Sequence, residues 1–200
     1  MRPAFVESYI ESTRMNTFPH GELTYYLRGI GFRVHNALKG GHEEKVYEEA
    51  LVWILEQEKI PNRRQPKFCI AYKGKQVGEY YPDLTFAADR VIVDLKATLK
   101  IEPLHKAQML SYLAVTEAEL GFVMNFGTSH LATERLPNFL NQRKSPPWFQ
   151  DVPENILYPG LTNRVLECVH AVHRTLGPGF LSQVYRRATR IELESNFIAF

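Results

Sequence analysis

The sequence contains only two cysteines, Cys69 and Cys168, and it has no long apolar run. Two cysteines outside CxxC spacing cannot form a disulfide framework. Without a run of roughly 18 or more apolar residues, no membrane span is predicted. The first residues include acids and lack the apolar stretch of a secretory signal, so none is expected there. These absences predict a cytoplasmic protein that does not enter membranes.

An excess of charge is also missing, since 24 Lys and Arg stand against 22 Asp and Glu, for a net charge of +2. This balance disfavours a histone-like polybasic binder, so any nucleic-acid contact must come from local clustering. No P-loop, HExxH or GxSxG motif is present, which disfavours ATPase, zinc-protease and serine-hydrolase functions. The chain does have 44% hydrophobic and 12% aromatic residues, enough to bury a core.

Hydrophobic periodicity predicts an α+β domain. Helical spacing over 22–38 ends at Gly40-Gly41, and a second helix is expected over about 43–59. Apolar and alternating runs then predict strands at 67–73, 76–86, 90–96, 120–126 and 130–136, with a helix over about 103–115 before the last two strands. Cys69 alternates with apolar neighbours in the first of these strands and is expected to be buried.

The chain divides into four parts. Residues 1–21 read as an N-terminal extension, 22–137 as the α+β domain and the proline-rich stretch 138–160 as a linker. Residues 161–200 repeat the two helices that open the domain, because a shift of 138 aligns 23–60 with 161–198 without a gap. The identities include Leu23/Leu161, Val34/Val172, His35/His173, Gly41/Gly179, Val46/Val184, Tyr47/Tyr185 and Ala50/Ala188.

A hairpin within the domain carries the most informative polar residues. If the chain turns tightly at Ala88-Asp89, residues whose numbers sum to 177 face each other, and Asp83 lies opposite Asp94. Two carboxylates so placed repel each other unless a cation lies between them. The two-residue period of a strand puts Lys96 on the same face as Asp94. An exposed hairpin edge with a fortuitous charge cluster is the alternative.

This combination, Pro82-Asp83 followed by Asp94-Leu95-Lys96, resembles the signature of the PD-(D/E)XK nuclease superfamily. Gly41-x-x-Glu44-x-x-Tyr47 is similar to the signature of its GxxExxY family. Two later blocks also resemble that family: Leu104-His105-x-Ala107-Gln108-x-x-x-Tyr112-Leu113 and Gly121-Phe122-x-x-Asn125-Phe126-Gly127. The resemblance covers about residues 22–136 and implies a restriction-endonuclease-like core, in which a mixed β-sheet is flanked by helices, followed here by the two-helix partial repeat.

The resemblance also implies a site and an activity, namely hydrolysis of phosphodiester bonds, expected to be those of DNA. Glu44, Asp83, Asp94, Lys96 and Gln108 would be the catalytic residues. Asp83, Asp94 and Glu44 would hold Mg²⁺ or Mn²⁺, with the Leu95 carbonyl as a further ligand. The alternative function is an inactive module of the same fold that binds nucleic acid or protein.

A basic stretch between Lys59 and Gly78 is the expected source of attraction for nucleic acid. It contains no acid, and aromatic residues are interleaved with the bases. The candidate nucleic-acid-binding residues are Arg63, Arg64, Lys67, Lys73, Lys75 and, on the helix of Gln108, Tyr112. A solvated charged rim is the alternative for the bases, and core packing for Tyr112.

The helices at 161–200 have Ser182 in place of Glu44 and no counterpart of Asp83, Asp94 or Lys96, so they cannot form a second active site. They keep an apolar stripe that two isolated helices cannot bury. We therefore expect them to dock on the domain or on a second chain, most simply as a homodimer contact. The alternative is a disordered remnant.

Overall fold

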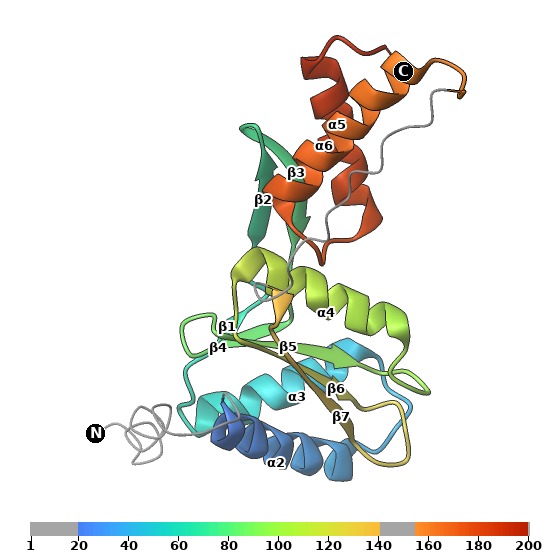
Figure 1. Cartoon of the computed structure of the whole chain (residues 1–200). Coiled ribbons are helices and arrows are strands. Elements are labelled where there is room, and N and C mark those ends of the chain that lie inside the picture. The colour runs from blue at the N-terminus through green and yellow to red at the C-terminus, as the bar shows by residue number, and fades with distance from the viewer. Residues whose placement is uncertain (1–19, 141–154, 200) are drawn as a thin grey trace.

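A mixed five-stranded sheet forms the centre of the first part of the chain in the computed structural model, which describes residues 20–140 and 155–199 (Figure 1). The sheet order is β1-β4-β5-β6-β7. Its strands are β1 (Arg63–Arg64), β4 (Leu84–Phe86), β5 (Val91–Lys96), β6 (Leu120–Asn125) and β7 (Ala132–Pro137). The pair β5–β6 is parallel and is connected through helix α4 (Pro103–Thr116), whereas the other pairs are antiparallel.

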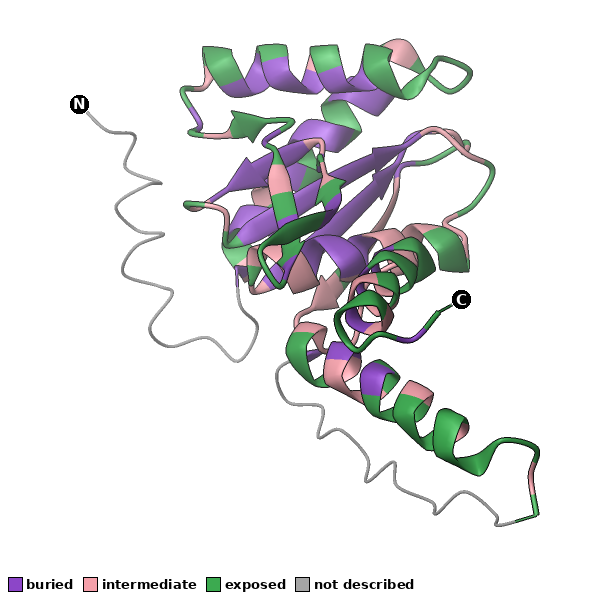
Figure 2. Ribbon diagram, turned by 90° about the horizontal axis from the view of Figure 1, so that it is seen from above, coloured by how far each residue is buried: buried purple, intermediate pink, exposed green. Residues whose placement is uncertain are grey.

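Helices cover both faces of this sheet. The helices α2 (Gly21–Leu38) and α3 (Glu44–Gln57) pack on one face, where Leu27, Leu55 and Val93 belong to one apolar core. The helix α4 covers the other face, where Met109 packs with Ile92 and Val123. Every residue of β5 and β6 is therefore buried, as the central strands of Figure 2 show. This explains why their sequences are nearly continuous apolar runs.

The expected strand 76–86 is wrong, because the chain breaks at Tyr81-Pro82-Asp83. Proline has no N–H to donate to a ladder, so a strand rarely continues through it. The strand β3 (Lys75–Tyr80) pairs only with β2 (Phe68–Tyr72), in a separate two-stranded sheet that we call the arm. The two-residue strand β1 carries no periodicity and was not expected. Cys69 is exposed rather than buried.

The repeated helices dock on this arm within the same chain. The helices α5 (Pro159–Leu176) and α6 (Ser182–Ser195) bury an apolar cluster with Ile70, Tyr72 and Val77 (Figure 1). The Ser111 hydroxyl of α4 donates a hydrogen bond of 3.0 Å to the Gly179 carbonyl between the two helices. The stripe is thus covered in part, because Val172, Val184 and Ala188 are buried whereas Leu161 and Val169 are exposed. A homodimer contact stays a prediction.

The expected linker 138–160 falls largely on residues 141–154, outside the described part of the chain, and its last two residues belong to α5. Among the described helices, none is long and apolar enough to cross a membrane.

Candidate active site

The register of β4 and β5 places Asp83 and Asp94 at the same end of the sheet. Phe86 faces Val91 and Leu84 faces Val93, so the pairing sum of 177 is confirmed. Asp83 directly precedes β4, and its Oδ2 accepts a hydrogen bond of 2.6 Å from the Leu95 N–H. This bond holds the first carboxylate against the strand that carries the second.

Both carboxyl groups resist ionisation. Burial, followed by the negative charge of Asp94, raises the pKa of Asp83 from 3.8 to about 7. Burial also raises the pKa of Asp94, and the nearby positive charge of Lys96 offsets this only in part. A pair of buried acids with raised pKa values is an arrangement that a bound cation would relieve.

The Lys96 ammonium contacts Asp94 and the backbone beside it. Its Nζ is 2.6 Å from Asp94 Oδ2 and donates a hydrogen bond of 3.0 Å to the Leu95 carbonyl. The contact is an ion pair without hydrogen-bond geometry, so the buried Asp94 Oδ2 accepts no hydrogen bond. Lys96 itself is buried. A lysine is seldom buried unless an acid pairs with it, as Asp94 does here. A single positive charge therefore occupies a pocket of oxygen acceptors.

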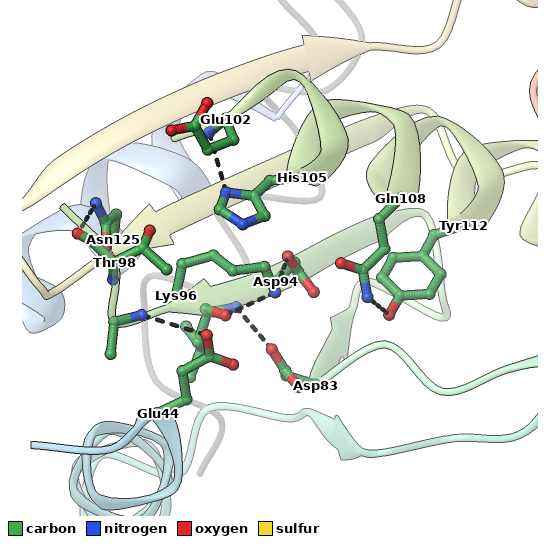
Figure 3. Close-up of polar contacts among 12 residues, drawn as sticks. Glu44, Asp83, Asp94, Lys96, Thr98, Glu102, His105, Gln108, Tyr112 and Asn125 are labelled. Atoms are coloured by element: carbon green, nitrogen blue, oxygen red, sulfur yellow. Dashed lines mark hydrogen bonds and ion pairs between the residues drawn. The ribbon is translucent and has the colours of Figure 1, made fainter. Parts of the chain in front are cut away.

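Glu44 approaches the pair from the other side (Figure 3). It is the first residue of α3, and its Oε1 accepts a hydrogen bond of 3.3 Å from the Ala97 N–H, just beyond β5. Its negative charge contributes to the raised pKa of Asp94. The helix dipole would favour an acid at this position whatever its function. The hydrogen bond from Ala97, however, holds the Glu44 carboxylate at the site.

Gln108 and Tyr112 lie one turn apart on α4 and face the two aspartates (Figure 3). Gln108 Nε2 donates a hydrogen bond of 2.7 Å to the Tyr112 hydroxyl. Tyr112 is only 4% exposed and packs edge-on against Tyr80. Burial, with the negative charge of Asp94 second, raises the pKa of Tyr112. Its ring is thus part of the core, and a direct role in nucleic-acid binding stays a prediction.

Two further residues of the site were quoted in the sequence blocks without a role. The ring of His105 lies beside Lys96 and Asp94, and its Nδ1 accepts a hydrogen bond of 3.0 Å from the Glu102 N–H (Figure 3). Asn125 is fully buried and bonds both the N–H and the carbonyl of Thr98, at 3.0 and 2.9 Å. Asn125 thus ties the loop after Lys96 to β6. The sequence feature that could have indicated this role is a polar residue at the end of an apolar strand.

The basic residues expected to bind nucleic acid are mostly paired with acids. Arg63 pairs with Asp89, Arg64 with Glu48 and Glu49, Lys67 with Glu79, and Lys73 with Glu192. Lys75 lies at the start of β3, and no ion pair involves it among the described residues. The stretch is therefore closer to electrical balance than its sequence indicates, and its role in binding stays a prediction.

The oxygen donors of the site suit a divalent cation that keeps some of its waters. Among the described residues, no three His, Cys, Asp or Glu side chains converge as a ready-made metal cluster. The convergent donors are the carboxylates of Asp83 and Asp94 and the carbonyl of Leu95, with Glu44 beyond them. Mg²⁺ is commonly held by one or two carboxylates and several waters, so this set suits it better than zinc.

A mixed sheet with acids at one end and helices on both faces defines a protein of the restriction-endonuclease-like fold class. The sequence model of the PD-(D/E)XK nuclease superfamily matches residues 21–136 and 159–200, and the chain belongs to this superfamily. No curated protein matches the chain significantly. Among solved structures, one titled "Crystal structure of SSO0001" is 15% identical over 69% of each chain, with a TM-score of 0.37.

Proposed function

We propose that the chain is a nuclease that hydrolyses DNA phosphodiester bonds with Mg²⁺ or Mn²⁺. The observation that carries the proposal is the buried pair Asp83 and Asp94, both with raised pKa values and with the Lys96 ammonium against Asp94. Two buried carboxyl groups side by side destabilise the metal-free fold, so a structural role does not account for the pair. Superfamily membership supports the nuclease type of this function.

Each residue has a role that its placement supports. Asp83, Asp94 and the Leu95 carbonyl would hold the cation, and Glu44 would orient a water beside it. A bound divalent cation supplies Lewis acidity toward the phosphate and lowers the pKa of a bound water. Lys96 would leave Asp94 and the Leu95 carbonyl to stabilise the charge that develops on the phosphate. Gln108, positioned by the Tyr112 hydroxyl, would hold the substrate or that water.

Membership of the GxxExxY family is part of the same proposal. In the segment Gly41-x-x-Glu44-x-x-Tyr47, the fully buried Tyr47 donates a hydrogen bond of 2.7 Å to the Lys39 carbonyl. Gly41 has a φ of 103°, a region that favours glycine. The motif thus builds the turn that presents Glu44 to the site.

A cleavage assay on supercoiled, linear and single-stranded DNA tests the proposal, with Mg²⁺, with Mn²⁺ and with EDTA. We expect strand cleavage with either cation and none with EDTA. Parallel purification of the Asp94→Asn protein controls for contaminating nucleases, because this variant should be inactive. Absence of cleavage on every DNA, together with no metal-dependent change in melting temperature, would favour the inactive binding module.

A further inference from the structure

The helices α5 and α6 reproduce the local geometry of α2 and α3 in detail. The bounds of each pair differ by 138 residues. Tyr47 donates to the Lys39 carbonyl at 2.7 Å, and its counterpart Tyr185 donates to the Gly177 carbonyl at the same distance. Gly41 and Gly179 have φ values of 103° and 114°. The two pairs can therefore be compared residue by residue.

The two pairs dock through different faces. The inner face of α6 carries Val184, which is 4% exposed, whereas its counterpart Val46 in α3 is 41% exposed. The contact with the arm is close, because a Cβ built on Gly78 would lie 3.0 Å from Val184 Cγ2. Glu192 accepts a hydrogen bond of 2.7 Å from the Tyr72 hydroxyl and also pairs with Lys73. The helix α6 therefore packs on β2 and β3 through a face that α3 leaves partly exposed.

Part of the face that α3 buries is consequently open to solvent in α6, whereas the counterparts of Tyr47, Leu51 and Leu55 are half-buried. In α3 this face includes Glu48 and Val52, which are 5% and 8% exposed. Their counterparts are Arg186 and Arg190, both exposed. Between them along the helix, Arg187 donates a hydrogen bond of 3.2 Å to the Val77 carbonyl of β3. In this part of the face, a buried acidic and apolar surface has become an exposed basic one.

The change of charge extends over the whole repeat. Residues 21–59 contain five basic and seven acidic residues, whereas residues 159–197 contain five basic and three acidic ones. Two of those three acids, Glu192 and Glu194, pair with Lys73 and Arg190. Among the described residues no ion pair involves Arg186 or Arg187, so these two arginines bring positive charge to the arm. Arg190, like most basic residues of the stretch 63–73, is paired with an acid.

The arm also leads directly to the site. The strand β3 ends at Tyr80, and Asp83 follows after Tyr81 and Pro82. The base of the arm is fixed to α4 through the contact of Tyr80 with Tyr112, whose hydroxyl bonds Gln108. The base of the arm therefore lies next to the site.

We infer that Arg186 and Arg190, with Arg187 on the same helix, form a surface that binds the phosphate backbone of DNA outside the cleavage site. The inference rests on the proposed function for its ligand. Exposed arginines without base contacts bind phosphates regardless of sequence, so the surface would add affinity and reach rather than sequence preference.

The test measures DNA binding in an Asp83→Asn background, in which the proposed site is inactive. Fluorescence anisotropy with a labelled DNA duplex of about three helical turns gives the affinity at several salt concentrations. We compare Arg186→Glu combined with Arg190→Glu against a matched control, Arg28→Glu combined with Arg33→Glu, which makes the same charge change at exposed positions of α2. The arm variant should lose affinity on the order of tenfold, and its salt slope should fall by about two.

Equal losses in the arm and control variants, or an unchanged salt slope in the arm variant, would overturn the inference. Melting temperatures check that each variant folds, and Arg186→Gln combined with Arg190→Gln replaces the reversal if it does not fold, with the same fall in slope expected. Cleavage by the wild-type protein is measured separately. Failure of the proposed function would appear there, whereas failure of the arm surface would appear only in binding.

Discussion

The raised pKa of Asp83 predicts an unusual dependence of stability on pH. A carboxyl group whose pKa is higher in the folded state binds more protons when folded than when unfolded. The contribution of Asp83 to the stability of the metal-free protein should therefore fall as the pH rises from about 4 through about 7. An ion-paired aspartate behaves in the opposite way, because its contribution to stability grows as the pH rises toward about 5 and is constant above that. Asp83→Asn removes the charge but keeps an oxygen that can accept from the Leu95 N–H.

The size of the effect follows from the shift. A change from 3.8 to about 7 corresponds to at most about 4 kcal/mol of lost stability, at 1.36 kcal/mol per pKa unit. Asp83 is not fully buried, so solvent reduces this figure. At pH 8 without metal, Asp83→Asn should therefore be more stable than the wild-type protein by a few kcal/mol. At pH 4 the two should be nearly equal.

Urea unfolding in EDTA between pH 4 and pH 8 measures this difference, with Glu43→Gln as a control at an exposed acid beside the site. Mg²⁺ should restore stability to the wild-type protein, by about 2.7 kcal/mol at a concentration of 100 times Kd, and should add much less to Asp83→Asn. The reasoning is refuted if the stability of the variant relative to the metal-free wild-type protein does not grow between pH 5 and pH 8, that is, if the two proteins show the same pH profile.

Four other changes test separate parts of the account. Lys96→Ala should slow cleavage at least tenfold while Mg²⁺ affinity, measured by calorimetry, is kept or raised, because the ammonium leaves the oxygens of Asp94 and Leu95. Glu44→Gln should lower the cleavage rate and Glu43→Gln should not, in assays run side by side. His105→Asn should reduce the rate while leaving the melting temperature within a few degrees, since the ring is only partly buried. Ala188→Asp should place a charge in the fully buried contact with the arm and cost about 3 kcal/mol or more, visible as faster hydrogen exchange in β2 and β3 than in β5.

The sequence predicted the parts of the fold that depend on local pattern. The helices α2, α3 and α4 and the strands β5, β6 and β7 follow apolar periodicity, and each lies within three residues of its expected bounds. The facing of Phe86 and Val91 was predicted from the short turn alone. The break at Pro82 was missed because the runs on both sides of it are strand-like, and which sheet each would join depends on packing far along the chain.

In the candidate site, too, local pattern was predictable and contacts between distant elements were not. Asp83, Asp94 and Lys96 come together through strand register, which a sequence can indicate. The pairing of Arg64 with Glu48 and of Lys73 with Glu192 depends on contacts between distant elements, so the sequence overstated the free positive charge of the stretch 63–75. The position of α6 on the arm depends on the same kind of contact. An apolar stripe indicates that a helix docks but not where.

The most direct test of the central claim is the Mg²⁺ dependence of DNA cleavage in the wild-type protein and in Asp94→Asn, purified in parallel. Asp94 is the buried acid that contacts Lys96, and the amide that replaces it has nearly the same size. The account predicts a cleavage rate that rises with Mg²⁺ and saturates in the wild-type protein, and a loss of at least a hundredfold in the variant. Equal rates in the two proteins, or cleavage that persists in EDTA, would contradict it.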